Sequence, residues 1–218
     1  MYILYPPGFD PNKKWPVVVL IHGGPQGTFG DDFHYRWNAQ LFAAPGYVVS
    51  CINFHGSTSF GQDFTDSITK NWGGLPYIDI MKGVDYLAEK PFVATDRFGA
   101  AGGSYGGYMV NWIATQTDRF GALISHAGVY NAVSMYGATE ELWFPEWEFN
   151  GPFWQDMTYY KKWSPHYFAG NLGKYQTPTY VIHGQHDYRV PVTQGFEFYT
   201  ALKRQGVPAR LLYYPDET

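Results

Sequence analysis

The chain has 218 residues, of which 45% are hydrophobic and 16% are charged. This composition is typical of a folded globular protein and excludes intrinsic disorder, and the length suits a single domain over residues 1–218. The net charge is −4 and the sequence contains no basic run, which makes nucleic acid and anionic membranes poor partners.

The lone cysteine, Cys51, excludes an intrachain disulfide and falls in an apolar strand pattern, where a buried thiol is expected. No apolar stretch approaches the length of a membrane span, and the first residues do not resemble a signal peptide. We therefore expect a soluble protein and leave its compartment open.

Strand-like and helix-like runs alternate along the chain. In chain order, the patterns predict a strand over 17–21, a helix over 31–44, a strand over 47–52, a helix over 77–90, a strand over 97–101, a helix over 108–117, strands over 122–125 and 179–182, a helix over 193–205 and a strand over 210–214. Such alternation predicts an α/β fold, in which helices cover both faces of a mostly parallel sheet. In such folds, the binding and catalytic residues lie beyond the carboxyl ends of the strands.

The segment 102–106 reads Gly-Gly-Ser-Tyr-Gly, with a strand predicted before it and a helix after it. This is the context of a nucleophile elbow, a tight turn that pushes the serine above the edge of the sheet. Ser104 then lies at a helix N-terminus, where free N–H groups favour developing negative charge. An ordinary Gly-rich turn with an exposed serine is the alternative.

A serine nucleophile needs an acid, a base and donors for the oxyanion. Asp187 follows the predicted strand 179–182, downstream of the serine, as the acid of such hydrolases does; a turn or capping aspartate is the alternative. One oxyanion donor is the backbone N–H of Tyr105, and the other comes from the glycine-rich stretch 22–25 after the first strand, unless that stretch is a simple Gly-Pro turn.

The base is the missing part. None of the seven histidines follows Asp187, and His126, which follows a predicted strand close to the elbow, is the best substitute. The histidines also lack metal-ligand spacing, so we expect neither a metal ion nor another cofactor.

The stretch 130–170 interrupts the alternation and is rich in aromatic residues and prolines. It reads as an insertion that forms a cap or pocket wall over the strand ends, although an interface or plain packing would also explain it. Its glutamates, Glu140, Glu141, Glu146 and Glu148, favour a solvated acidic edge over a site for a substrate amine.

The sequence resembles the catalytic domain of the prolyl oligopeptidase family of serine peptidases, within the acylaminoacyl-peptidase and dipeptidyl-peptidase V branch. The matching stretches cover nearly the whole chain: 22–25 (His-Gly-Gly-Pro), 56–61, 72–74, 102–107, 139–143 and 183–191. The resemblance implies an α/β-hydrolase fold, Ser104 as nucleophile, Asp187 as triad acid, and Gly24 and Tyr105 as oxyanion donors. It also matches Arg189 to an arginine that holds a substrate carbonyl in some relatives, with a surface salt bridge as the alternative.

Members of this family cleave short peptides or release N-terminal units, so a short peptide or acyl compound is the expected substrate. They carry a β-propeller and end in Pro-Asp-Glu-x-His, whereas this chain lacks the propeller and ends Pro-Asp-Glu-Thr at Thr218. We therefore expect a truncated fragment with impaired turnover, in which exposed apolar surface invites self-association. A small-ester carboxylesterase and a non-catalytic hydrolase-fold module are the alternatives.

Overall fold

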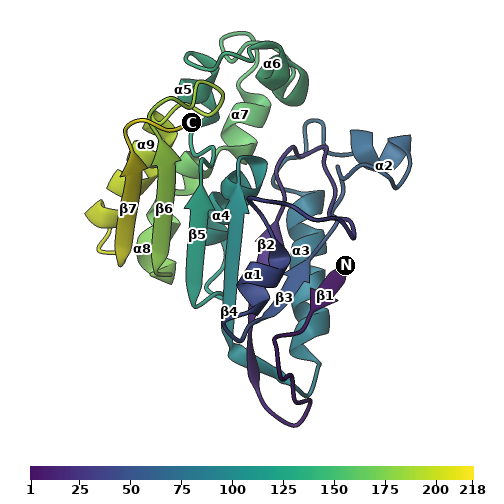
Figure 1. Cartoon of the computed structure of the whole chain (residues 1–218). Helices are drawn as coiled ribbons and strands as arrows, with labels where there is room; N and C mark the ends of the chain where they lie inside the picture. The colour runs from purple at the N-terminus through teal and green to yellow at the C-terminus, as the bar shows by residue number, and fades with distance from the viewer.

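A computed structural model describes residues 1–218 and contains one seven-stranded sheet (Figure 1). The strands are β1 (Tyr2–Leu4), β2 (Trp15–Ile21), β3 (Val48–Cys51), β4 (Val93–Gly103), β5 (Ala122–His126), β6 (Thr179–Gly184) and β7 (Ala209–Tyr214). Their order in the sheet is β1-β3-β2-β4-β5-β6-β7, in which β1 runs antiparallel to β3 and every other pair is parallel. The parallel strands bring their carboxyl ends, and the loops that follow them, to one edge of the sheet.

The helices are α1 (Ala39–Ala43), α2 (Gln62–Asp66), α3 (Leu75–Ala88), α4 (Tyr105–Gln116), α5 (Ala132–Tyr136), α6 (Trp143–Phe149), α7 (Thr158–Trp163), the 3₁₀ helix η1 (Pro165–Phe168), α8 (Gly170–Tyr175) and α9 (Thr193–Arg204). One face of the sheet packs against α3, α4, α8 and α9 in a core of 37 buried residues. The other face has a cluster of five buried residues beneath α1. Helices thus lie on both faces, as predicted, but very unequally.

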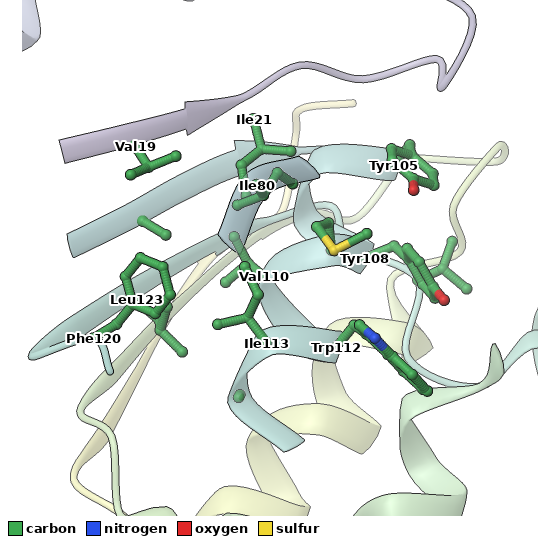
Figure 2. Packing of buried hydrophobic residues seen from close by; sticks show 14 of the residues in the cluster. Val19, Ile21, Ile80, Tyr105, Tyr108, Val110, Trp112, Ile113, Phe120 and Leu123 are labelled. Carbon is green, nitrogen blue, oxygen red and sulfur yellow. The ribbon is translucent and has the colours of Figure 1, made fainter. Parts of the chain in front are cut away.

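Helix α4 lies at the centre of the larger core. Figure 2 shows Val110 and Ile113 of this helix among Val19 and Leu123 of the sheet and Ile80 of α3. All five are buried to 1% exposure or less. Ser104, the residue just before α4, therefore lies between a buried strand, β4, and a buried helix.

The predicted strands are confirmed, with shifts of bounds, and the helices predicted around 77–90, 108–117 and 193–205 are α3, α4 and α9. The helix predicted over 31–44 is wrong except at Ala39–Ala43. The Nδ1 atom of His34 accepts the backbone N–H groups of Arg36 and Trp37, each at 3.0 Å, so a side chain takes the donors that a helix would use. Asn38 then caps the short helix that does form.

The stretch 130–170 lies between β5 and β6 and contains α5, α6, α7 and η1, none of which the sequence analysis predicted. In Figure 1, α5, α6 and α7 lie beyond the arrowheads of β5 and β6. None of the helices combines the length and the apolar character needed to cross a bilayer.

Candidate active site

Ser104 lies in a sharp turn between β4 and α4. Its φ of 58° and ψ of −121° are outside the regions that ordinary residues adopt. Strand and helix approach so closely here that a Cβ atom added to Gly106 would lie 2.1 Å from the carbonyl oxygen of Ile21, and one added to Gly102 would lie 2.5 Å from Gly106. The Ser104 N–H donates to the His126 carbonyl at 3.0 Å, which ties the turn to β5. This is the geometry of a nucleophile elbow.

Residues 22–27, called here the glycine loop, follow β2 and run beside the serine. A Cβ atom added to Gly23 would lie 3.8 Å from Ser104 Oγ, so the loop passes close to the hydroxyl. Gly24 has a φ of +123°, which a glycine adopts without strain. On the other side of the serine, Tyr105 occupies the first position of α4, where a backbone N–H has no partner within the helix.

His22 holds the base of the glycine loop. Its Nδ1 lies 2.7 Å from the carbonyl oxygen of Gly23, and its Nε2 lies 2.8 Å from Ser57 Oγ. Burial lowers the pKa of His22 to about 4, against an effect of the Gly23 hydrogen bond that raises it. The ring is therefore neutral at pH 7, with Nδ1 donating to the carbonyl and Nε2 accepting from the hydroxyl.

Asp187 lies in the loop after β6. Its Oδ1 accepts the backbone N–H groups of Arg189 at 3.1 Å and Val190 at 2.9 Å. Its Oδ2 lies 3.7 Å from Nε2 of the buried His183, whose hydrogen bond is made to the Val190 carbonyl at 2.7 Å. The loop fixes one carboxylate oxygen and leaves the other free to accept a hydrogen bond from a neighbouring imidazole.

Ser104 and Asp187 line the same cavity, which measures about 1100 Å³. Gly24, His126 and Thr218 also line it. The sheet topology explains the convergence, since β2, β4, β5 and β6 all end at this edge.

The last residues of the chain lie against the Asp187 loop. The His186 N–H donates to the Glu217 carbonyl at 2.9 Å, and the Gln185 N–H donates to the Tyr214 carbonyl at 2.8 Å. These bonds hold the segment that ends at Thr218 beside the cavity.

A second pocket of about 300 Å³ opens beside Ser104 and is mainly apolar. Its apolar wall comes from the segment before α3, the turn, the loop after β5, the stretch 130–170 and the Asp187 loop. It is formed by Trp72, Tyr105, Val129, Met135, Trp143, Phe144 and Val190. Ser104 therefore lies where a large open cavity meets a small aromatic pocket, an arrangement suited to holding an apolar side chain next to a reacting carbonyl.

The polar side chains of this pocket pair with one another. Arg189 donates from Nη2 to Glu140 Oε1 at 3.2 Å, and its Nε lies 2.9 Å from Glu141 Oε2. Arg189 and Glu141 both line the pocket, and the Arg189 side chain is 61% exposed. The salt bridge considered from the sequence is present, and it places the guanidinium at the pocket mouth.

The expectation of a solvated acidic edge is wrong for Glu148. It is buried, and its carboxylate accepts hydrogen bonds from Gln26 Nε2 at 2.7 Å and Trp72 Nε1 at 2.9 Å. No local pattern around position 148 separates it from the half-exposed Glu146 two residues earlier. Only the three-dimensional contacts distinguish the two.

No histidine bonds to Ser104. The Nδ1 atom of His55 pairs with Asp79 at 2.6 Å, far along the chain from the elbow. His126 lines the cavity with Ser104, and burial, followed by the nearby His183, lowers its pKa. No group of three or more His, Cys, Asp or Glu side chains is arranged to hold a metal ion.

Comparison with known proteins shows the family to which this chain belongs. The profile of the Prolyl oligopeptidase family matches residues 33–218. Dipeptidyl-peptidase 5 of Aspergillus fumigatus is 45% identical over 219 residues, which cover 99% of this chain and 30% of that protein. The corresponding protein of Arthroderma otae is 44% identical over 223 residues, which cover 100% of this chain and 30% of its own length. The chain thus spans about a third or less of the curated relatives it matches.

Solved structures agree. Acylaminoacyl peptidase of Pyrococcus horikoshii superposes with a TM-score of 0.90 at 33% identity, over 99% of this chain and 34% of that one. A puromycin-hydrolyzing peptidase of Mycobacterium tuberculosis superposes with a TM-score of 0.85 at 26% identity, over 98% and 32%. Together with the sheet topology, these likenesses confirm the predicted α/β-hydrolase fold.

Proposed function

This chain belongs to the prolyl oligopeptidase family of serine peptidases, and we propose that it carries the chemistry of a peptidase that cleaves short peptides through an acyl-enzyme. The observation that carries the proposal is the convergence of Ser104, in an elbow, and Asp187, with one free oxygen, on a single cavity.

In the proposed reaction, Ser104 Oγ attacks the carbonyl carbon of the scissile bond as an imidazole removes its proton. Asp187 orients that imidazole through Oδ2. The oxyanion is stabilised by the backbone N–H groups of Gly24 and Tyr105, which line the small pocket together with Ser104. The imidazolium then protonates the leaving amine. In the second half of the reaction the imidazole removes a proton from water, the water attacks the acyl-enzyme carbonyl, and the imidazolium returns a proton to Ser104 Oγ as it leaves.

The imidazole is the open part of this proposal, since no histidine follows Asp187. The hydrogen bond from His186 N–H to the Glu217 carbonyl holds the segment that ends at Thr218 beside the Asp187 loop, and Thr218 lines the cavity. A histidine attached directly after Thr218 would therefore enter the cavity next to the free carboxylate oxygen. His126 is the alternative base within these 218 residues.

The small pocket supports an apolar residue before the scissile bond. Its wall is built from aromatic side chains such as Trp143 and Phe144, and Arg189 lies at its mouth, where it would hold a substrate carbonyl. Acylaminoacyl peptidase, a structural relative, has been solved in complex with Z-Gly-Gly-Phe-chloromethyl ketone. A phenylalanyl group is thus the first choice for a test substrate.

The test compares this chain with the same chain extended by one histidine after Thr218, and with a control extended by one alanine. Hydrolysis of a blocked peptidyl-phenylalanine anilide and of a small nitrophenyl ester is measured for each. Because a missing triad member costs about 10⁴-fold or more in rate, we expect the histidine to raise anilide hydrolysis by about 10³-fold or more and the alanine to leave it unchanged.

Two substitutions test whether the hydrolysis comes from the proposed site. Ser104→Ala in the histidine-extended chain abolishes hydrolysis, and Asp187→Asn lowers it by about 10⁴-fold. Hydrolysis that survives Ser104→Ala, or a histidine extension no better than the alanine one, would refute the proposal. Hydrolysis of esters without anilides would instead identify a carboxylesterase.

A further inference from the structure

Glu148, in α6, is a buried carboxylate with no cation beside it. It is 1% exposed and takes part in none of the ion pairs of the structure. Both oxygens instead accept hydrogen bonds, Oε1 from Gln26 and Oε2 from the indole of Trp72. Burying a carboxylate is costly, and the cost is offset only where its oxygens are bonded as they are here.

The two donors belong to segments far apart in the sequence that both reach the site. Gln26 lies in the glycine loop, two residues after Gly24 and within a turn closed by the bond from the Gly27 N–H to the Pro25 carbonyl at 2.8 Å. Trp72 lines the small pocket together with Ser104. The carboxylate is the one side chain that bonds to both.

Trp72 in turn contacts the second oxyanion residue. Its carbonyl accepts the hydroxyl of Tyr105 at 2.6 Å, and its indole meets the Tyr105 ring edge-on with centroids 5.2 Å apart. A continuous chain of contacts therefore runs from Gln26 through Glu148 and Trp72 to Tyr105.

We infer that Glu148 is a positioning residue that sets the separation of the two oxyanion donors, holding the glycine loop through Gln26 and the Tyr105 side through Trp72. This inference rests on the oxyanion role proposed above for Gly24 and Tyr105. Neither bond reaches the substrate, so the residue acts only through its two partners.

The ionised form of Glu148 suits this task. Two N–H donors point at the two oxygens, and a proton on either oxygen would face a donor instead of an acceptor. Burial raises the pKa of the Glu148 carboxyl above its ordinary value, and the hydrogen bonds from Trp72 and Gln26 offset only part of this rise. It is the geometry of the two donors that favours the carboxylate.

A simpler role would be to anchor α6 to the fold. That helix already has a backbone anchor, because the Lys70 N–H donates to the carbonyl of Glu148 at 2.9 Å, and this bond does not depend on the side chain. The experiment must therefore separate order in the glycine loop from stability of the whole domain.

Four variants of the present chain make that separation: Glu148→Gln, Gln26→Glu, the double swap of both, and Glu146→Gln. The double swap returns one carboxylate and one amide to the pair, and the amide at 148 still accepts from Trp72. Glu146 is the matched control, since it lies in the same helix and bonds to the hydroxyl of Tyr136 at 2.8 Å, away from the loop.

The readouts are amide hydrogen exchange at Gly27 and Phe29, the indole N–H resonance of Trp72 and, with one histidine attached after Thr218 in each variant, the rate at which a fluorophosphonate modifies Ser104. Each single swap at the pair should speed exchange at Gly27 by about tenfold or more, because a charge-assisted bond is lost locally. The double swap should return it to within about twofold of the parent chain, and Glu146→Gln should leave it unchanged. The Ser104 modification rate should follow the same order.

Unchanged exchange at Gly27 in Glu148→Gln, an equal rise over the whole chain, or no recovery in the double swap would overturn the inference. If Glu148→Gln does not fold, Gln26→Glu alone decides, because Gln26 is exposed and its change leaves α6 untouched. If Ser104 reacts in none of the histidine-extended variants, the proposed function fails, whereas the exchange data still show whether Glu148 orders the loop.

Discussion

The strand-end loops around Ser104 and the stretch 130–170 form two sides of one pocket, and they are built by different means. On the loop side, close backbone contacts determine the structure, because Gly102 and Gly106 lie where no Cβ atom fits. On the other side, called here the ring side, the packing of aromatic side chains determines the structure. Phe149 and Tyr160 stack with centroids 4.9 Å apart, and Phe149 also contacts Trp72. The loop side therefore tolerates almost no change of residue, whereas side chains on the other side can change in size while the fold persists.

Gly106→Ala gives the largest expected effect. The added methyl would lie 2.1 Å from the Ile21 carbonyl oxygen, between a strand and a helix that are both fixed by the core. We expect a loss of more than about 4 kcal/mol in the free energy of unfolding, measured by urea titration. Gly170→Ala is the control, because no atom lies within 4 Å of its added Cβ; equal losses in both variants would contradict the backbone argument.

Phe149→Ala tests the ring side. The side chain is fully buried at 0% exposure between Tyr160 and Trp72, so its removal leaves a cavity and should cost about 3–4 kcal/mol. Trp147, in the same helix, is 67% exposed, and its change to Ala should stay within about 0.5 kcal/mol. Similar losses for the two would mean that the stretch packs loosely and only covers the pocket.

The same contrast explains what could be predicted from the sequence. A backbone requirement leaves glycines at fixed spacing, and from that spacing the sequence predicts the elbow at Ser104 and the glycine loop. Gly24, Ser104 and Asp187 line one cavity, and their catalytic roles stay predictions. The helix expected over 31–44 is mostly absent because the His34 imidazole takes two backbone N–H groups, a contact that periodicity does not reveal.

The aromatic stretch 130–170 shows no comparable pattern in the sequence from which its helices could be predicted. Its helices are as short as the five residues of Ala132–Tyr136, too short for apolar residues to show helical spacing. Nor could local sequence show that Glu148 is buried while Glu146 is not, since the difference comes from Gln26 and Trp72, which lie 122 and 76 residues away.

A pH titration examines the loop side without altering its packing. The pKa of His22 is lowered by burial from 6.5 to about 4 in the folded chain. Between these values the unfolded chain binds a proton that the folded chain refuses, so stability is complete above pH 6.5 and falls as the pH drops toward 4. His22 alone should cost about 2 kcal/mol between pH 7 and pH 5.

Other buried histidines add to this slope, because burial also lowers the pKa of His126, His166 and His183. The contribution of His22 is therefore the difference between the parent chain and His22→Gln, measured by urea titration across this pH range. The variant is expected to be less stable at pH 7 but to lose stability less steeply. Parallel pH profiles would show that the His22 ring already binds its proton in the folded chain.

Trp143→Ala should have the smallest effect on the fold and a selective effect on binding. The indole lines the small pocket but is 66% exposed, so unfolding should change by less than about 0.5 kcal/mol. A phenylalanyl substrate would lose one ring contact, worth about 1 kcal/mol, or several-fold in kcat/KM, in the histidine-extended chain. An alanyl substrate does not reach the indole and should be cleaved as before, so an equal loss for both substrates would place Trp143 outside the pocket that selects the side chain. Because the wall on this side is a side chain, such a change alters which residue fits without moving the elbow that would attack it.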